Sequence, residues 1–220
     1  MQKVLDLSGD AGDHFGNSVS ISIDYAVVGA SIDDVGANVN QGSASIYTFN
    51  GAGWTLMQKN TDAVGTANSF FGGSVSINAT GYVIIGAAGD DVSGNVAQGS
   101  ASIYRLNGTN WVLQQKLTDG NGGSGDNYGI HVSIAGGGNY VLIGAPFDDI
   151  GANASQGSAT IYMRVGNIWQ KFQYITDPGG FADDKFGIST AIDGDTKRFI
   201  IGSFVFPTNN AGKAVFGKIN

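Results

Sequence analysis

The sequence predicts an all-β fold in which one four-stranded antiparallel unit occurs four times. Two observations carry this prediction: the composition, and a set of landmarks that return at near-constant spacing. Of the 220 residues, 36 are Gly, and all 18 acidic residues are Asp. Abundant Gly, Asp, Asn and Ser favour turns, and the absence of Glu disfavours helices. The chain has no Cys, which excludes disulfides and thiolate chemistry.

The first landmark is an aromatic residue followed by Gly, which recurs at spacings of 56, 57 and 58 residues. An apolar run ending in Gly comes next, then a Gly-Ser-Ala segment, and last a Trp eight residues before an Asp. The aromatic residues are Phe15, Phe71, Tyr128 and Phe186, and the tryptophans are Trp54, Trp111 and Trp169. Such self-similarity indicates a repeat architecture, whose fourth copy is degenerate from Gly212 onward.

Each repeat predicts four strands in order. The first alternates Val19, Ile21 and Ile23 with serines, and these small polar partners suit close packing of one sheet on the next. The second is a nearly continuous apolar run, such as residues 140–143, which is typical of a strand buried on both faces. The third carries the Ser-Ala alternation and the fourth starts at the Trp. An Asn-Gly pair such as Asn50-Gly51 favours a tight hairpin between them.

Four-stranded antiparallel units in tandem are typical of β-propeller blades. We expect one domain over residues 1–220, with repeats at approximately 7–62, 63–119, 120–177, and 178–220 plus 1–6. Residues 1–6 align with the end of a fourth strand, and the chain ends after a third strand. We therefore predict a β-propeller of four four-stranded blades, in which the N-terminal strand completes the last blade and hides open strand edges. Two chains that share one larger ring are the structural alternative.

The repeat resembles a known family. Phe-Gly-x-Ser-Val-Ser-Ile at residues 15–21, Val-Val-Gly-Ala at 27–30 and Gly-Ser-Ala-x-Ile-Tyr at 42–47 are similar to the FG-GAP repeat, with Ala145-Pro146 in the third copy. That family builds the propeller of integrin α subunits and of many bacterial surface proteins. The resemblance implies a propeller in an extracellular adhesion or ligand-binding setting, without naming a ligand.

One departure from the integrin-type pattern concerns calcium. Repeats of that type often carry an Asp-x-Asp-x-Asp-Gly loop between their first and second strands. Here these connections are short, and only Asp193-Gly194-Asp195 retains a fragment of the motif. We therefore do not carry the calcium sites of the family over to this chain.

The carboxylates gather in particular loops. Fifteen of the 18 fall in loops that lead into a first strand or leave a second strand, and these loops share one end of an antiparallel blade. Several cationic residues fall at or near the opposite end, namely Arg105, Arg164, Lys197, Arg198 and Lys218. We expect a charge-polarised disc whose acidic face attracts cations or cationic partners.

The candidate site residues lie in the loops that follow the second strands. Clustered Asp oxygens are hard ligands suited to Ca²⁺, and amides beside carboxylates suit sugar hydroxyls. The same residues suit turn capping and loop pinning, which we favour as their role. The candidates for metal binding are Asp33, Asp34, Asp90, Asp91, Asp148 and Asp149, and those for ligand binding also include Gln41, Gln98 and Gln156. Pro207-Thr208-Asn209-Asn210 replaces the pair in the fourth repeat, so a repeated site would number three.

The remaining features narrow the function. A net charge of −7 disfavours nucleic acid, and no apolar run approaches the ~20 residues of a membrane span. Repeated carboxylates indicate binding, since a catalytic pair normally occurs once, so we expect no enzyme. We expect an extracellular or cell-surface binding module for adhesion or carbohydrate recognition, with a glycan or protein at the acidic face, although residues 1–3 do not open a signal peptide. The alternatives are a structural or protein-docking propeller of a larger surface protein, and a glycan-processing enzyme.

Overall fold

A computed structural model describes residues 1–204 and 212–219, and these form four antiparallel sheets without a helix. We call the sheets blades 1 to 4. Blade 1 comprises β1 (Ser18–Ser22), β2 (Tyr25–Ala30), β3 (Ser43–Phe49) and β4 (Trp54–Asn60). Blade 2 comprises β5 (Phe71–Ile77), β6 (Tyr82–Ala87), β7 (Ser100–Asn107) and β8 (Asn110–Leu117). Blade 3 comprises β9 (His131–Ile134), β10 (Tyr140–Ala145), β11 (Ser158–Val165) and β12 (Ile168–Ile175), and blade 4 comprises β13 (Ser189–Asp193), β14 (Arg198–Ser203) and β15 (Lys213–Lys218).

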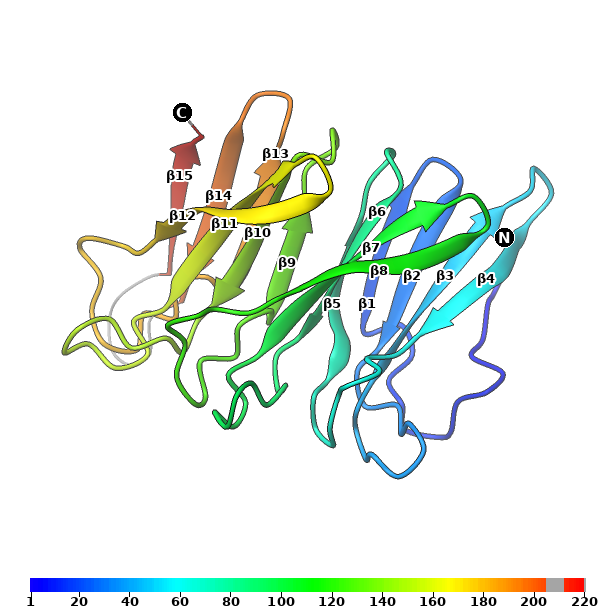
Figure 1. Ribbon diagram of the computed structural model, residues 1–220, viewed down its shortest axis with the longest axis horizontal. Helices are drawn as coiled ribbons and strands as arrows, with labels where there is room; N and C mark the ends of the chain where they lie inside the picture. The colour runs from blue at the N-terminus through cyan, green and yellow to red at the C-terminus, as the bar shows by residue number, and fades with distance from the viewer. Residues whose placement is uncertain (205–211, 220) are drawn as a thin grey trace.

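The blades stand face to face in a row (Figure 1). Within each blade the strands follow one another in sequence order, each paired antiparallel with the next. The first strands β1, β5, β9 and β13 contact one another along the row, so they form its inner edge. Among the described residues no helix is long and apolar enough to cross a bilayer.

The alternation of the first strands explains how the blades stack. The serine side of β1 faces the valine and isoleucine side of β5, and β5 faces β9 in the same way. At the third joint His131 and Ser133 of β9 face Thr190 and Ile192 of β13. The backbone N–H of Ile77 donates to Ser20 Oγ (3.1 Å), and that of Ile134 donates to Ser76 Oγ (3.2 Å). Ile192 N–H and Ser133 Oγ repeat this bond between blades 3 and 4 (3.2 Å). The serine hydroxyls thus satisfy amides at the edge of the neighbouring blade.

The aromatic-Gly landmark marks a close approach of two backbones. A Cβ placed on Gly86 of β6 would overlap the carbonyl oxygen of Gly129 in blade 3. Gly29 and Gly144 meet the glycines of the next aromatic-Gly pairs in the same way. Gly129 also has φ = 91°, a conformation that favours glycine. Glycine is therefore required on both sides of each joint between blades.

The core lies between the blades. Three apolar clusters fill the successive gaps, and their members come from the faces of adjacent sheets. Trp111 and Trp169 are almost fully buried there. The side chain of a glutamine in the preceding blade bonds to the backbone of each tryptophan. Gln58 accepts from the backbone N–H of Trp111 and donates to its backbone carbonyl, and Gln115 bonds to Trp169 in the same way. The tryptophans are thus packing residues of the joints.

The ends of the row correct the expectation that the N-terminal strand completes the last blade. β15 pairs with β14 alone among the described residues, and blade 4 has three strands. The N-terminal segment lies against blade 1, where Gln2 accepts from Trp54 N–H (2.7 Å) and donates to its carbonyl (2.8 Å). The two termini lie at opposite ends of the row (Figure 1), so the chain forms an open array of blades. The loop Pro207–Asn210 lies outside the described residues.

Candidate functional site

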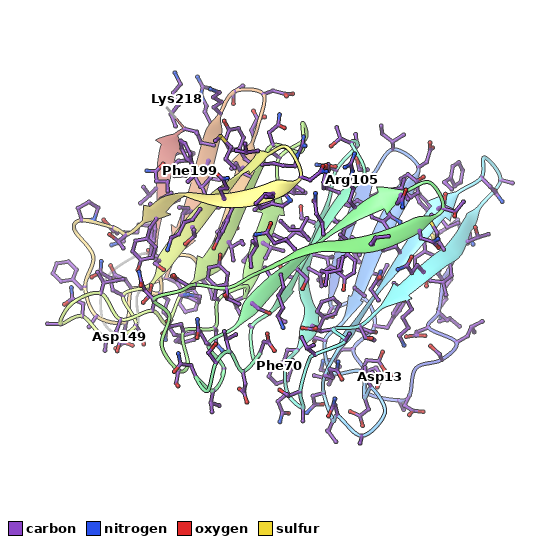
Figure 2. All side chains as sticks on the ribbon, in the orientation of Figure 1. Asp13, Phe70, Arg105, Asp149, Phe199 and Lys218 are labelled. Atoms are coloured by element: carbon purple, nitrogen blue, oxygen red, sulfur yellow. The ribbon has the colours of Figure 1, made fainter. Side chains whose placement is uncertain are left out.

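The candidate site is the edge of the row formed by the loops that leave the second strands and the loops that lead into the first strands. We call this edge the loop rim. Asp13, Phe70 and Asp149 lie along it, and Arg105 and Lys218 lie along the opposite edge (Figure 2). This separation agrees with the polarity that the sequence predicts, since fifteen carboxylates belong to loop-rim segments.

The second aspartate of each pair caps a small hairpin. The loops after β2, β6 and β10 each contain an isolated bridge, for example between Val35 and Asn38. Asp34 Oδ1 accepts from Asn40 N–H (2.8 Å), and Asp91 and Asp149 accept in the same way from Ala97 and Ser155. All three carboxylates are exposed to solvent. They therefore keep an oxygen that faces water while the loop beneath them is fixed.

Gln41, Gln98 and Gln156 are buried and link neighbouring loops through hydrogen bonds of their side-chain amides. Gln41 Nε2 donates to the carbonyl of Asp62 (2.5 Å), and its Oε1 accepts from Asn38 (2.8 Å). Asn38 also donates to the carbonyl of Gly65 (3.2 Å). The same bonds join Gln98 to Asp119 and Asn95, and Gln156 to Asp177 and Asn153. Both polar ends of each amide are thus engaged within the protein.

The first aspartate of each pair points inward to a partner on the same blade. Asp33 lies 2.6 Å from Lys59 Nζ and accepts from Ser43 Oγ, and Asp90 lies 2.7 Å from Lys116 Nζ. In blade 3 the residue at the position of Lys116 is Tyr174, whose hydroxyl donates to Asp148 (2.5 Å). The structure therefore separates each pair into one engaged carboxylate and one exposed carboxylate.

The lysines of the fourth strands also reach the preceding repeat. Lys59 Nζ lies 2.8 Å from Asp6, and Lys116 Nζ lies 2.7 Å from Asp62. Each ammonium thus joins the loops of two neighbouring repeats. No sequence motif singles these lysines out as site residues, although each follows a Gln and stands three residues before an Asp, Asp62 or Asp119.

In blades 3 and 4 a lysine at a different sequence position forms the salt bridge with the loop-rim carboxylates. Lys171, three residues before Tyr174, lies 3.1 Å from Asp119. Blade 4 has no fourth strand of its own in the described residues, and its cation comes from β15. Lys213, at the position of Ser43, lies 2.6 Å from both Asp177 and Asp184. At every blade a lysine therefore forms a salt bridge with carboxylates of the loop rim.

The electrostatics of the loop rim differ between engaged and unengaged carboxylates. Burial alone would raise the pKa of Asp6, but hydrogen bonds from Lys59 and Ser8 outweigh it and hold that pKa below its usual range. Burial raises the pKa of Asp126, and the charges of Asp148, Asp149 and Asp119 raise it further, while a hydrogen bond from the backbone N–H of Gly123 opposes this rise. Burial is the main cause of this raised pKa, and the neighbouring carboxylates add to it.

No group of three or more carboxylates or histidines within residues 1–204 and 212–219 is arranged to hold a metal ion. The candidates Asp33 and Asp34, Asp90 and Asp91, and Asp148 and Asp149 each divide their side chains between different partners, as described above. Asp193 and Asp195 lie in the β13–β14 turn, where Asp193 accepts from Asp195 N–H (3.0 Å) and from Thr196 Oγ1 (2.6 Å). These two aspartates form a capped turn.

The exposed part of the loop rim repeats three times. Each of the first three blades presents one carboxylate beside one exposed apolar residue at the loop tip. The pairs are Asp34 with Val39, Asp91 with Val96, and Asp149 with Ala154. Four lysines form salt bridges with seven of the fifteen loop-rim carboxylates, so the surface stays acidic. Such a surface attracts cationic groups and offers apolar contact beside each charge.

Comparison with known proteins agrees with the repeat. The model of the FG-GAP repeat matches residues 1–47, 54–104 and 111–162. Each match begins in a fourth-strand segment or at its Trp and ends at a third strand, so it spans a joint between blades. A search of curated proteins gave no match. The matched segments cover more than half of the chain, which therefore belongs to the FG-GAP repeat family.

Proposed function

We propose that this chain is a non-catalytic binding module, which docks a protein partner with a basic surface on the loop rim. The observation that carries the proposal is the threefold repeat of an exposed carboxylate beside an exposed apolar residue. The FG-GAP repeat supports an integrin-like module, and we extend the proposal to adhesion at the cell exterior on that ground.

The internal bonds of the loops favour a protein over a glycan as ligand. Sugar recognition uses side-chain amides that can donate and accept in pairs. The amides of Gln41, Gln98 and Gln156 already donate and accept within the loops. What remains exposed at the loop tips is negative charge with small apolar side chains, which suits lysine and arginine side chains on a protein surface.

The rigidity of the loops also supports docking. Each loop tip is fixed by a bridge, by a capping Asp and by a glutamine pin, so little ordering is needed when a partner binds. Binding by a preorganised surface loses less conformational entropy than binding by a mobile one. Equivalent loops on successive blades then offer one partner several contacts at once.

The test compares two triple variants with the same change in net charge. D34N/D91N/D149N removes the exposed charges of the loop rim and keeps an oxygen to accept the capping N–H. D24N/D193N/D195N removes three exposed charges from the opposite edge. Binding of a decalysine peptide is measured by biolayer interferometry at two salt concentrations. We expect the first variant to lose at least tenfold in affinity and the second to stay near wild type.

Equal losses in both variants would show that only net charge matters, and the loop rim would then not be the docking surface. A glycan array with and without Ca²⁺ tests the carbohydrate alternative directly. Glycan binding that survives D34N/D91N/D149N would place recognition elsewhere on the molecule. A calorimetric titration with Ca²⁺ tests metal binding, and heat that disappears in this triple variant would assign a calcium site to these loops.

A further inference from the structure

The two outer blades each leave one face uncovered. We call the outward face of blade 1 the first end face, and define it by Val19, Ile21, Ala26 and Val28. We call the outward face of blade 4 the last end face, and define it by Ser189, Ala191, Ile200, Gly202, Ala214 and Phe216. Strand pairing places the members of each set directly beside one another on one side of the sheet.

Equivalent residues inside the row are buried. Val19 and Ile21 are 69% and 67% exposed, whereas Val75 and Ile77 at the same positions of blade 2 are 8% and 6% exposed. Phe216 is 78% exposed, whereas Ile46, Ile103 and Ile161 at its position are fully buried. The end faces therefore expose side chains that every inner joint covers. Apolar exposure of this kind marks an interaction surface.

The two end faces are the two halves of one joint. At the inner joints the valine and isoleucine side of one first strand, or Thr190 and Ile192 in blade 4, meets the opposite face of the preceding blade. In blade 1 that opposite face combines small residues with Val27 and Ile46. The first end face has the valine and isoleucine pattern. The last end face combines the small residues defined above with Ile200 and Phe216, which stand at the positions of Val27 and Ile46. Gly202 stands at the position of Gly86, and a Cβ placed on it would meet only Ser189 of its own blade. The backbone approach that each inner glycine makes is thus unused at Gly202.

The strand edges at the two ends also match. β3, β7 and β11 each pair with a fourth strand, whereas the outer edge of β15 pairs with no described strand. The N-terminal segment holds Trp54 through Gln2, as β4 holds Trp111 through Gln58. β4 pairs with β3 through its backbone, while the side chain of Gln58 contacts Trp111 of the next blade, so one strand can make both contacts. Residues 1–5 therefore occupy the place of a fourth strand beside blade 1, and they pair with no described third strand.

We propose that a second copy of this chain binds head to tail, with the first end face of one copy on the last end face of the other. Residues 1–5 of one copy would pair with β15 of its partner and complete blade 4. The two end faces of one chain lie at opposite ends of the row (Figure 1), so in this arrangement one chain cannot join its own ends. This proposal uses neither the loop rim nor its ligand.

Because the two halves differ, the contact is heterologous. It generates a closed ring if the rotation between copies closes, and an open filament if it does not. Completing blade 4 in this way also covers the free edge of β15, which would otherwise template unspecific strand pairing.

The test measures the mass of the full chain by light scattering at increasing concentration. We expect a mass that rises to at least twice the 22.6 kDa of one chain. I21D blocks the first end face and F216D blocks the last, and each variant alone should stay monomeric. A mixture of the two should form a one-to-one dimer, because one intact pair of faces remains. L113D, an exposed apolar residue of β8, is the control and should assemble like wild type.

Two further variants address the joint itself. G202A adds a Cβ where the partner backbone approaches, and it should abolish assembly while thermal unfolding of the monomer changes little. A191S restores the hydroxyl that Ser20, Ser76 and Ser133 supply at inner joints, here as an acceptor for Ile21 N–H of the second copy. One added hydrogen bond should tighten assembly about fivefold.

A wild-type chain that stays monomeric at all concentrations would overturn the proposal. So would a mixture of I21D and F216D that fails to dimerise while wild type assembles, because that result requires a different contact. Circular dichroism of each variant establishes that its fold is intact, so a loss of assembly cannot be attributed to unfolding.

Discussion

Blade 2 and blade 4 carry the same repeat in different surroundings. Every residue of β6 is buried, because blades 1 and 3 cover both of its faces. In β14 the burial alternates, because only blade 3 covers it. Each repeat therefore encodes two sheet faces that can pack against another blade. Whether a face is buried in the core depends on whether an adjacent blade covers it. This behaviour is typical of repeat proteins, whose stability is the sum of repeats and of the interfaces between them.

Blade 4 also departs from blade 2 in composition. Lys213 takes the position of a buried serine and provides the cation that Lys116 provides from the fourth strand in blade 2. Ala191 takes the position of a serine that bonds the next blade. Lys213 thus pairs with Asp177 and Asp184 without a lysine from a fourth strand. Ala191 makes the outward face of blade 4 less polar than the equivalent inner faces.

We expect the largest difference in stability between the two blades from an alanine substitution at one equivalent glycine, Gly86 in blade 2 and Gly202 in blade 4. Gly86→Ala places a methyl group against the backbone of Gly129, which no rotamer can relieve, and we expect a loss of about 3 kcal/mol or more in the free energy of unfolding. Gly202→Ala meets only the hydroxyl of Ser189, which can rotate away, so we expect less than about 1 kcal/mol. Urea denaturation of both variants measures the difference. Equal losses would contradict the close approach of blades at Gly86.

The next effect concerns the lysines of the loop rim. Lys116→Met leaves Asp62 and the buried Asp90 without their cation, and we expect a loss of about 2 kcal/mol, because the ammonium is partly solvated. Lys171→Met is the control, since Lys171 is more exposed and its one salt bridge within the described residues is to Asp119. We expect less than about 1 kcal/mol there. Chemical denaturation at neutral pH checks both, and a larger loss in Lys171→Met would refute the assigned roles.

The smallest effect concerns the joint between blades 3 and 4. His131 Nδ1 accepts from Thr190 N–H (3.2 Å), and burial lowers the pKa of His131. A lowered pKa in the folded state means that stability present above the unfolded pKa of about 6.5 is lost as the pH falls through the folded value. His131→Ser matches Ser74 at the previous joint and should remove this pH dependence. Thermal melts between pH 7.5 and 5 measure it, and an unchanged slope would count against the assignment.

The repetition of the sequence was enough to predict the strands and the joints. The alternation of serine with valine and isoleucine in β1 depends on neighbours two residues apart, and it correctly predicted that small residues lie between sheets. The tryptophans that mark the start of the fourth strands recur with the repeat, and Trp111 and Trp169 pack between blades. Local patterns were sufficient in these cases because the contacts recur in every repeat.

The loop rim and the ends of the row could not be predicted in the same way. Lys59 joins Asp6 and Asp33, which lie 53 and 26 residues away, and no local pattern indicates such a contact. In blade 3 the lysine position holds Tyr174, which obscures the repeat. Among the described residues β15 pairs only with β14, and the repeat pattern does not indicate what pairs with its outer edge.

The asymmetry of each blade has a consequence for how such an array changes in length. One face of a repeat combines small residues with two larger apolar ones, and the other face carries branched side chains, so a duplicated copy inserted anywhere meets compatible neighbours on both sides. Its lysine would find the aspartate of whichever repeat precedes it. Lengthening or shortening the array by whole units therefore demands no simultaneous change at a second position, and natural selection can vary the number of blades one duplication at a time.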